Sequence, residues 1–113
     1  MSWMLRTSVM MPPEYKSPYR VTPRAYQDLL NIGRYSERNW GRKQRNRYLQ
    51  ALETRFQWLA NNPLLGKKRN DIDPDYYSFL QGQHVVFYLI SQHGIDIIGI
   101  PHQEMDIHSY FDS

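Results

Sequence analysis

The spacing of apolar residues changes once along this 113-residue chain, and this change constrains the fold more than any other feature. Between residues 23 and 61, apolar side chains recur every three or four positions, which is typical of amphipathic helices. Between residues 77 and 100 they form three short runs separated by turn residues, which is typical of strands. A chain that keeps its helices and its strands in separate blocks is predicted to fold as an α+β domain.

Two helices are predicted in the first block. Thr22 and Pro23 predict a helix start, because threonine caps free N–H groups and proline suits the first helical position. This helix is expected over residues 23–38, a turn over 39–41, and a second helix over 42–61, which Pro63 stops. Such a pair forms an antiparallel hairpin. Its buried faces are predicted to carry Tyr26, Leu29, Leu30 and Gly33 on the first helix and Tyr48, Leu49, Leu52, Phe56 and Leu59 on the second.

The strands are predicted to form an antiparallel meander. The runs 77–80, 84–90 and 95–100 are rich in aromatic and β-branched residues, and Gly82 and Gly94 mark the turns between them. The middle run is apolar almost throughout, so we expect it to be the central strand. With a short strand at 19–21 and a polar linker at 63–75, the prediction is a helical hairpin packed on an antiparallel sheet of three to four strands.

Length and composition favour one globular domain. A chain with 41% hydrophobic and 22% charged residues has room for a single core. We assign this single domain to residues 19–113, after an N-terminal extension over 1–18. No apolar run approaches the roughly 20 residues needed to cross a bilayer. Because the start lacks a sustained apolar stretch and the chain has no cysteine, we expect a cytoplasmic protein without disulfides.

Charge is divided along the sequence. The first 69 residues hold all fourteen Lys and Arg against four Asp and Glu, a formal charge of +10. The remaining residues hold seven carboxylates and no cation, a formal charge of −7. Such a division predicts either two faces with different partners or a dipolar solvated surface.

Short stretches in a fixed order resemble the ParE branch of the RelE/ParE toxin superfamily. They are 19–25 with Asp28 and Leu29, then 40–41, 48–49 with Leu52 and Glu53, 62–63 with Gly66 and Lys67, Phe79 with Gly82, 84–88, and finally 98–106. No single stretch is diagnostic, but their joint order is, and it covers about four fifths of the chain. Pro101 departs from the aliphatic residue that is usual in the last stretch. Because proline lacks an N–H, it is expected to end the last strand early.

The resemblance implies the toxin of a type II toxin–antitoxin system. Members of the ParE branch are expected to trap DNA gyrase on cleaved DNA, which blocks replication, and to be neutralised by a ParD-like antitoxin. This implies a protein that acts by binding, with no catalytic residue and no cofactor. The resemblance also places a variable C-terminal segment beside the sheet, to which we assign target binding. The residues are His102, Gln103, Met105, Asp106, Tyr110 and Phe111.

A basic cluster on the two helices is assigned to antitoxin binding. It comprises Arg34, Arg38, Arg42, Lys43, Arg45 and Arg47. The first two suit the dipole at the end of the first helix, whereas the other four oppose the dipole at the start of the second. Something other than helix stability therefore favours those four. We expect the cluster to receive acidic segments of an antitoxin whose amphipathic helix lies in an apolar groove. Phosphate binding has support as well, although no recognised DNA-reading motif is present.

The main alternative is a RelE-like, ribosome-dependent mRNA endoribonuclease. RNA cleavage by 2′-hydroxyl attack needs a proton acceptor, a proton donor and cations that stabilise the transition state. His84, His102 and Tyr110 could move protons, but the only nearby cations in the sequence are those of the run 67–69. Losing one charge-stabilising donor commonly costs about 10²–10³ in rate. We therefore favour the binding protein over the nuclease.

Structural roles are predicted for the two histidines. His84 shares a strand face with Val86 and Tyr88 and is expected to be hydrogen bonded. His102 is expected to order the turn after the last strand.

The C-terminal segment keeps three questions open. A metal site at His102, Asp106 and His108 is disfavoured, because this spacing fits one helical face poorly and no second group of ligands accompanies it. Tyr110 and Phe111 are expected either to dock on the body of the protein or to contact a partner. A toxin that has lost its activity and persists in an antitoxin–repressor complex is a third functional class.

Overall fold

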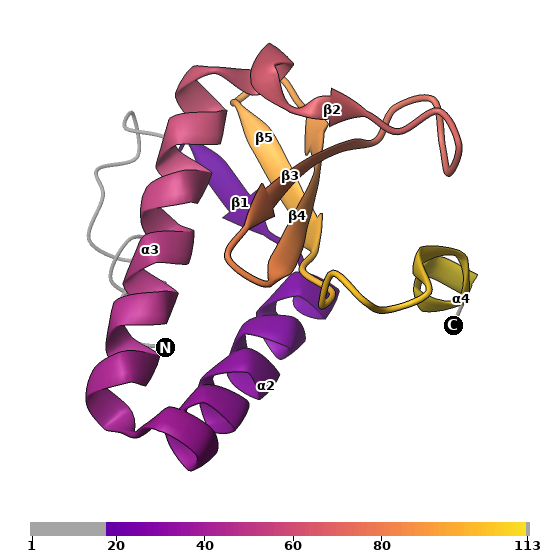
Figure 1. Ribbon diagram of the computed structural model, residues 1–113. Coiled ribbons are helices and arrows are strands. Elements are labelled where there is room, and N and C mark those ends of the chain that lie inside the picture. The colour runs from indigo at the N-terminus through magenta and orange to yellow at the C-terminus, as the bar shows by residue number, and fades with distance from the viewer. Residues whose placement is uncertain (1–17, 113) are drawn as a thin grey trace.

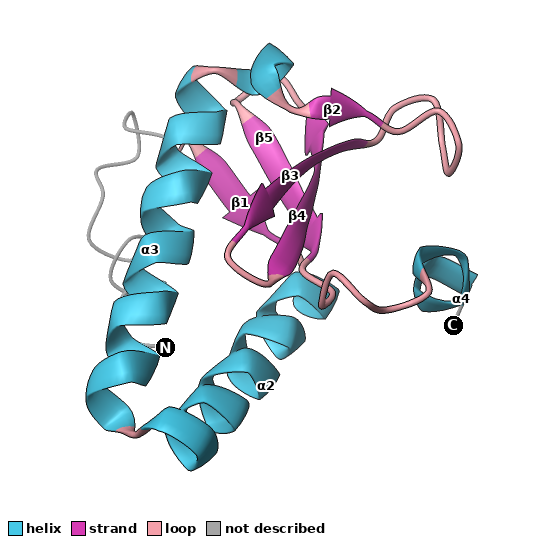
Figure 2. Ribbon diagram, viewed as in Figure 1, coloured by secondary structure: helices cyan, strands magenta, loops and turns pink. Residues whose placement is uncertain are grey.

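The computed structural model describes residues 18–112 and has the predicted α+β class (Figures 1 and 2). Its helices are α2 (Pro23–Trp40), α3 (Arg42–Asn61) and the short C-terminal α4 (Ile107–Asp112), with a 3-10 turn η1 (Pro63–Leu65) after α3. Its strands are β1 (Tyr19–Val21), β2 (Lys67–Lys68), β3 (Tyr77–Gln81), β4 (His84–Ile90) and β5 (Ile95–Gly99). The hairpin of α2 and α3 packs on one face of the sheet. Apart from Pro18, the predicted N-terminal extension lies outside the described residues.

The sheet is larger than predicted and its pairing is mixed. Its strand order is β1-β5-β4-β3-β2, with the predicted meander β3-β4-β5 in the middle and β4 at the centre. β1 pairs with β5 in parallel. Parallel pairing needs a long connection between strands, and α2 and α3 form part of the connection between β1 and the meander. β2 lies within the predicted polar linker and pairs with β3 through two residues, too few for a pattern to be recognised.

Thr22 caps α2 as expected, but the end of α2 lies two residues later than predicted. Thr22 caps α2 through its side chain, which accepts a hydrogen bond from the Ala25 N–H at 3.4 Å. The predicted end at Arg38 is wrong, because α2 continues to Trp40. Gly41 ends it with a φ of 89°, a left-handed conformation that favours glycine. One residue therefore separates the two helices, and Trp40 is helical instead of part of a turn.

The buried face of α2 carries smaller residues than predicted. Leu29 and Gly33 are buried as expected, but Tyr26 and Leu30 are only half-buried. Gly33 faces α3, and a Cβ there would make ordinary contact with Leu49 Cδ1 at 3.5 Å. The remaining buried residues of α2 are Ala25, Ile32 and Ser36. The predicted stripe of α3 is confirmed at Leu49, Leu52, Phe56 and Leu59, with Tyr48 half-buried.

Tyr88 joins the centre of the sheet to the segment that follows α3. Its ring is fully buried, and its hydroxyl donates to the Pro63 carbonyl at 2.7 Å and accepts from the Gly66 N–H at 3.0 Å. A Cβ on Gly66 would lie 2.1 Å from this hydroxyl, which explains the glycine. Burial raises the pKa of Tyr88, so the hydroxyl stays protonated and can donate.

None of the helices within residues 18–112 has the length and apolar character needed to cross a membrane.

Replacing Tyr88 with phenylalanine tests this connection. The variant leaves the Pro63 carbonyl and the Gly66 N–H without their partner, so we expect the free energy of unfolding to fall by about 1–3 kcal/mol in urea titrations. Tyr77→Phe is the matched control, because the Tyr77 ring stacks on Tyr88 at 5.5 Å. Equal losses in both variants would show that the hydroxyl of Tyr88 has no special role.

Candidate functional site

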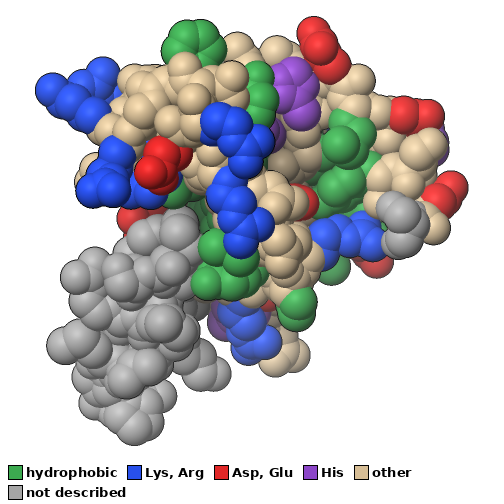
Figure 3. Space-filling model, turned by 90° about the horizontal axis from the view of Figure 1, so that it is seen from below, with side chains coloured by type: hydrophobic (Ala, Val, Ile, Leu, Met, Phe, Trp, Pro, Cys, Tyr) green, Lys and Arg blue, Asp and Glu red, His purple; other side chains and the backbone are tan. Residues whose placement is uncertain are grey.

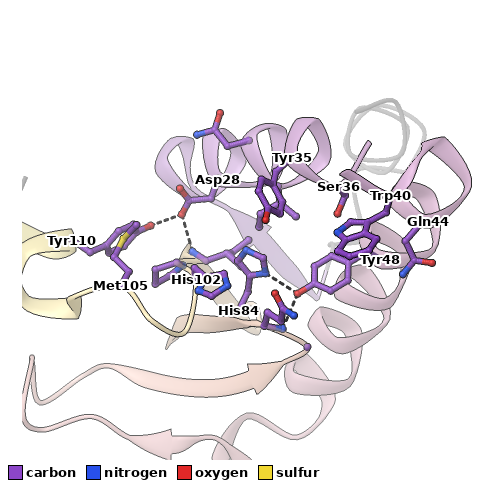
Figure 4. A pocket seen from close by; sticks show the side chains of 16 residues that line it. Asp28, Tyr35, Ser36, Trp40, Gln44, Tyr48, His84, His102, Met105 and Tyr110 are labelled. Carbon is purple, nitrogen blue, oxygen red and sulfur yellow. Dashed lines mark hydrogen bonds between the residues drawn. The ribbon is translucent and has the colours of Figure 1, made fainter. Parts of the chain in front are cut away.

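A groove of about 770 Å³ lies where α2, the start of α3 and the C-terminal segment meet (Figure 4). Three of the residues that line it are large apolar side chains in contact with solvent: Tyr35 is 60% exposed, Trp40 69% and Met105 48%. Exposed apolar side chains that gather in one hollow mark a binding surface. The groove is therefore the candidate site. Its complete lining is Asp28, Asn31, Ile32, Tyr35, Ser36, Trp40, Gln44, Tyr48, Gly82, Gln83, His84, Ile100, Pro101, His102, Met105 and Tyr110.

The floor of the groove is polar but internally hydrogen bonded. The Tyr48 hydroxyl lies 2.7 Å from Nδ1 of His84, accepts from the Gln83 N–H at 3.0 Å and donates to the Gln81 carbonyl at 3.3 Å. Gly82 stands at this turn because its φ is 60° and because a Cβ there would lie 2.7 Å from the Tyr48 hydroxyl. The prediction that His84 is hydrogen bonded is confirmed.

His84 is held in its neutral form. Burial, and secondarily the neighbouring His102, lower the pKa of His84 from 6.5 to about 4, while Asp28 opposes the shift. The two imidazole rings stand edge to face with centroids 5.4 Å apart. His102 Nδ1 accepts a hydrogen bond from the Glu104 N–H at 3.1 Å, so His102 orders the turn as predicted.

Asp28 closes one end of the groove. Its Oδ2 accepts the Ile100 N–H at 2.8 Å and the hydroxyl of Tyr110. β5 therefore ends at Gly99, before the expected Ile100, because the next N–H is turned toward α2 and Pro101 follows. Gly99 admits the Tyr110 ring, since a Cβ there would lie 2.4 Å from the Tyr110 hydroxyl. Burial and the hydrogen bond to Asp28 raise the pKa of Tyr110.

The C-terminal segment docks on the body of the protein. Residues 107–112 form α4, which the sequence pattern did not predict. Phe111 packs edge to face on Phe87 at 5.0 Å and against Tyr76 at 5.1 Å. Phe87 faces away from the hairpin and is nevertheless fully buried. The Arg24 guanidinium lies 5.2 Å from the Tyr110 ring. Of the two predicted arrangements for these aromatic residues, docking on the body is the one that the structure contains.

The other residues assigned to target binding lie in the turn before α4. Gln103, Met105 and Asp106 are exposed, and His102 is half-buried. Asp106 caps α4, because its carboxylate accepts the His108 N–H and the Ser109 hydroxyl, both at 3.1 Å. Among residues 18–112, no three His, Asp or Glu side chains gather in a way that could hold a metal ion, so His102, Asp106 and His108 do not converge.

The basic cluster does not form one surface. Arg45 is half-buried and pairs with Glu37 across the hairpin, and it also donates to Asn46. Arg34 donates to Asn31 at 3.5 Å along α2. Arg47 lies on the outer flank of α3, in a different hollow. The exposed members near the helical turn are Arg38, Arg42 and Lys43. Seen from below, most Lys and Arg side chains lie at the left and in the centre of the view, whereas Asp and Glu side chains lie both among them and along the right (Figure 3).

The cations of the run 67–69 lie away from His84. Lys67 pairs with Ser78 near the start of β3, whereas His84 pairs with Gln81 at its end. At about 3.3 Å per residue, these positions are about 10 Å apart along the strand. Arg69 is bound in place by Asp71, with two contacts of 3.0 Å, and lies 5.1 Å from the Phe87 ring centroid.

Most of the residues that line the groove are not recognisable as site residues from the sequence. The sequence places Asp28 in the family resemblance, Trp40 in a turn and Tyr48 on a helix face, and it gives Tyr35 no role; none of the four is predicted as a site residue. One available signal was the pair Tyr35 and Trp40, two large aromatic residues outside the predicted buried stripe. The meeting of α2 with residues 100–110 could not be predicted, because it depends on contacts across more than 70 positions, such as that between Asp28 and Ile100.

Known proteins resemble this chain in sequence and fold. Residues 19–107 match the family model described as the ParE toxin of the type II toxin–antitoxin system parDE. "Toxin ParE1" of Caulobacter vibrioides is 33% identical over 93 residues, 82% of this chain and 96% of that protein. "Toxin ParE1" of Mycobacterium tuberculosis is 33% identical over 92 residues, 80% of this chain and 94% of that protein.

A solved structure shares the fold at lower sequence identity. It is titled "Chromosomal ParDE TA system from P. aeruginosa" and matches with a TM-score of 0.66 at 17% identity. The match covers 76% of this chain and 95% of that chain.

The neutral His84 predicts a pH-dependent stability. Its pKa is lower in the folded state than in the unfolded chain, so unfolding takes up a proton between pH 6.5 and about 4. The contribution of His84 is complete above pH 6.5 and is lost as the pH falls toward 4. We expect a loss of about 1–2 kcal/mol, reduced by solvent screening because the ring is half-exposed. Urea titrations at pH 7 and pH 4.5 measure it, and His84→Gln should remove this part of the loss. An identical pH dependence in both proteins would contradict the prediction.

Proposed function

The chain belongs to the ParE toxin family and is the toxin component of a type II toxin–antitoxin system, and on this premise we propose that it blocks replication by binding DNA gyrase until a ParD-like antitoxin occupies its groove. The antitoxin part is supported chiefly by the groove, where Tyr35, Trp40 and Met105 are exposed in one hollow. The gyrase part is supported by the family.

An amphipathic helix of the antitoxin fits this groove best. Helices that bind in grooves insert apolar side chains on one face, and the exposed aromatic residues provide the corresponding apolar walls. The polar groups of the floor, Tyr48 and His84, bond to each other and to the backbone of the turn. Burying them beneath an apolar side chain therefore leaves few unsatisfied groups, which would otherwise cost about 1–3 kcal/mol each.

Basic residues beside the groove favour an acidic flank on that helix. Arg38 and Arg42 are exposed at the hairpin end that carries Trp40. Exposed charges of this kind add more to the association rate and the choice of partner than to affinity. Arg45 contributes less than the other members of the cluster, because Glu37 already neutralises it.

Target binding is proposed for the C-terminal turn, where Gln103, Met105 and Asp106 are exposed. Tyr110 and Phe111 contribute to it by holding α4 on the body. His102, Met105 and Tyr110 also line the groove. An antitoxin helix in the groove would therefore cover part of the target-binding segment, which gives neutralisation a steric basis. The separation of Lys67 from His84 supports binding over mRNA cleavage.

Purified protein tests the target. We expect it to inhibit DNA supercoiling by gyrase and to accumulate cleaved DNA, because a trapped cleavage complex cannot religate. The double variant Gln103→Ala, Met105→Ala should reduce inhibition while the protein remains folded, since both side chains are exposed. A truncation after Asp106 is a poorer test, because it would also uncover Phe87. Ribosome-dependent mRNA cleavage without gyrase inhibition would refute the proposal in favour of the nuclease, and the absence of both activities would indicate an inactive toxin.

Trp40→Ala tests the groove. Truncating a central aromatic anchor commonly costs at least about 2 kcal/mol, so the dissociation constant for the antitoxin encoded beside this toxin should rise about 30-fold. Isothermal titration calorimetry measures this change. Leu64→Ala is the matched control, because Leu64 is another exposed apolar residue, 73% exposed, and does not line the groove. If both variants bind as tightly as the parent protein, the antitoxin does not use the groove.

A further inference from the structure

The outer flank of α3 carries a second hollow, of about 500 Å³. The β3–β4 turn lies between it and the groove, since Gln81 lines this hollow whereas Gly82 and Gln83 line the other. The residues that line it are Arg47, Gln50, Ala51, Thr54, Arg55, Trp58 and Gln81. Lys43 is exposed one helical turn before Arg47 and continues the same stripe. We call these residues, with Lys43, the α3 flank.

Arg55 is oriented before any ligand binds. Its guanidinium carbon lies 4.7 Å from the ring centroids of both Trp58 and Phe79. Its Nε donates to the Gln81 side-chain oxygen at 2.7 Å. These contacts use the guanidinium plane and its Nε, and among residues 18–112 no hydrogen bond or ion pair engages its two terminal nitrogens. A planar guanidinium held in this way can bind an oxyanion through two donors and loses little further rotamer freedom.

The flank is uniformly basic. No carboxylate lines the hollow, and the only carboxylate of α3, Glu53, is half-buried and interacts electrostatically with Tyr19. Lys43 and Arg55 are twelve positions apart on the helix, about 18 Å at 1.5 Å per residue, with Arg47 between them. Between the cations, Gln50 and Thr54 offer neutral hydrogen-bond donors.

We propose that the α3 flank binds the phosphate backbone of DNA. Duplex DNA carries one charge per about 1.7 Å of its axis, so an 18 Å stripe always faces several phosphates, whatever the sequence. The neutral donors suit phosphate oxygens, and contacts to phosphates carry no sequence information, so the contact is independent of sequence. The six-residue cluster predicted for the antitoxin is thus divided: Lys43 and Arg47 belong to the DNA face, and Arg38 and Arg42 at the hairpin end belong to the antitoxin. This contact does not depend on whether gyrase is the target.

Fluorescence anisotropy with the full chain and a labelled duplex of unrelated sequence tests the proposal over a salt series. We expect the logarithm of the association constant to fall linearly with the logarithm of the salt concentration. Because each lost phosphate contact lowers this slope by about 0.9, Arg47→Gln with Arg55→Gln should reduce it by about 1.8 and weaken binding at low salt about tenfold or more. If the double variant does not fold, as judged by circular dichroism, Arg47→Gln alone should reduce the slope by about 0.9, since Arg47 is fully on the surface.

A matched control removes the same charge elsewhere. Arg20 and Lys67 are exposed, and they lie on the sheet face opposite the hairpin: Arg20 alternates with the buried Tyr19, and Lys67 pairs with Ser78, which neighbours Phe87. Arg20→Gln with Lys67→Gln should leave the affinity within about twofold of the parent.

Three results would overturn the proposal. The first is the absence of salt-dependent binding in the parent protein. The second is an equal loss in the control variant, which would show attraction by net charge alone. The third is tighter binding of a polyglutamate peptide than of DNA, sensitive to Arg47 and Arg55, which would assign the flank to an acidic protein partner.

Discussion

The carboxylate of Asp28 makes the contact on which the arrangement of the candidate site depends. One oxygen accepts the N–H of Ile100, the first residue after β5, and the hydroxyl of Tyr110 from α4. It therefore joins α2 to the end of the sheet and to the C-terminal helix at one point. Hydrogen bonds to a charged acceptor are stronger than neutral ones, about 1.5–3 kcal/mol. Asp28 holds α2 and residues 100–110 together at this point, and the groove lies between the parts of these two segments that are not in contact.

The groove and the C-terminal segment share residues, and this links the two proposed activities. His102, Met105 and Tyr110 line the groove, although they belong to the segment proposed to bind the target. Two partners that use one set of side chains cannot bind at the same time. The docking of Phe111 on Phe87 keeps the segment in place on the far face of the sheet. Neutralisation by occlusion then requires no conformational change in the toxin.

The charge division along the sequence is only partly a division in space. Arg24 lies against Tyr110 and Phe111, and Arg69 covers the ring of Phe87 and pairs with Asp71. Two cations of the basic half thus stabilise the acidic half through ring and ion-pair contacts. Most of the other exposed cations of the hairpin lie in two places: Arg38 and Arg42 at the end near Trp40, and Lys43 and Arg47 on the α3 flank. This separation is the reason to assign them to two different partners.

The sequence by itself determined the α+β class, the two long helices, the order of the three central strands and the stop before Pro101. These follow from local causes: periodicity, capping by Thr22, and the missing N–H of proline. The tertiary structure alone decided the parallel β1–β5 pair, the two-residue β2, the burial of Ser36 on α2, and the groove. Each of these depends on which distant segment packs nearby. The local sequence pattern does not show which distant segment packs nearby. The same apolar side chain fits a core face and a binding face equally well, and only its neighbours in the folded protein decide between them.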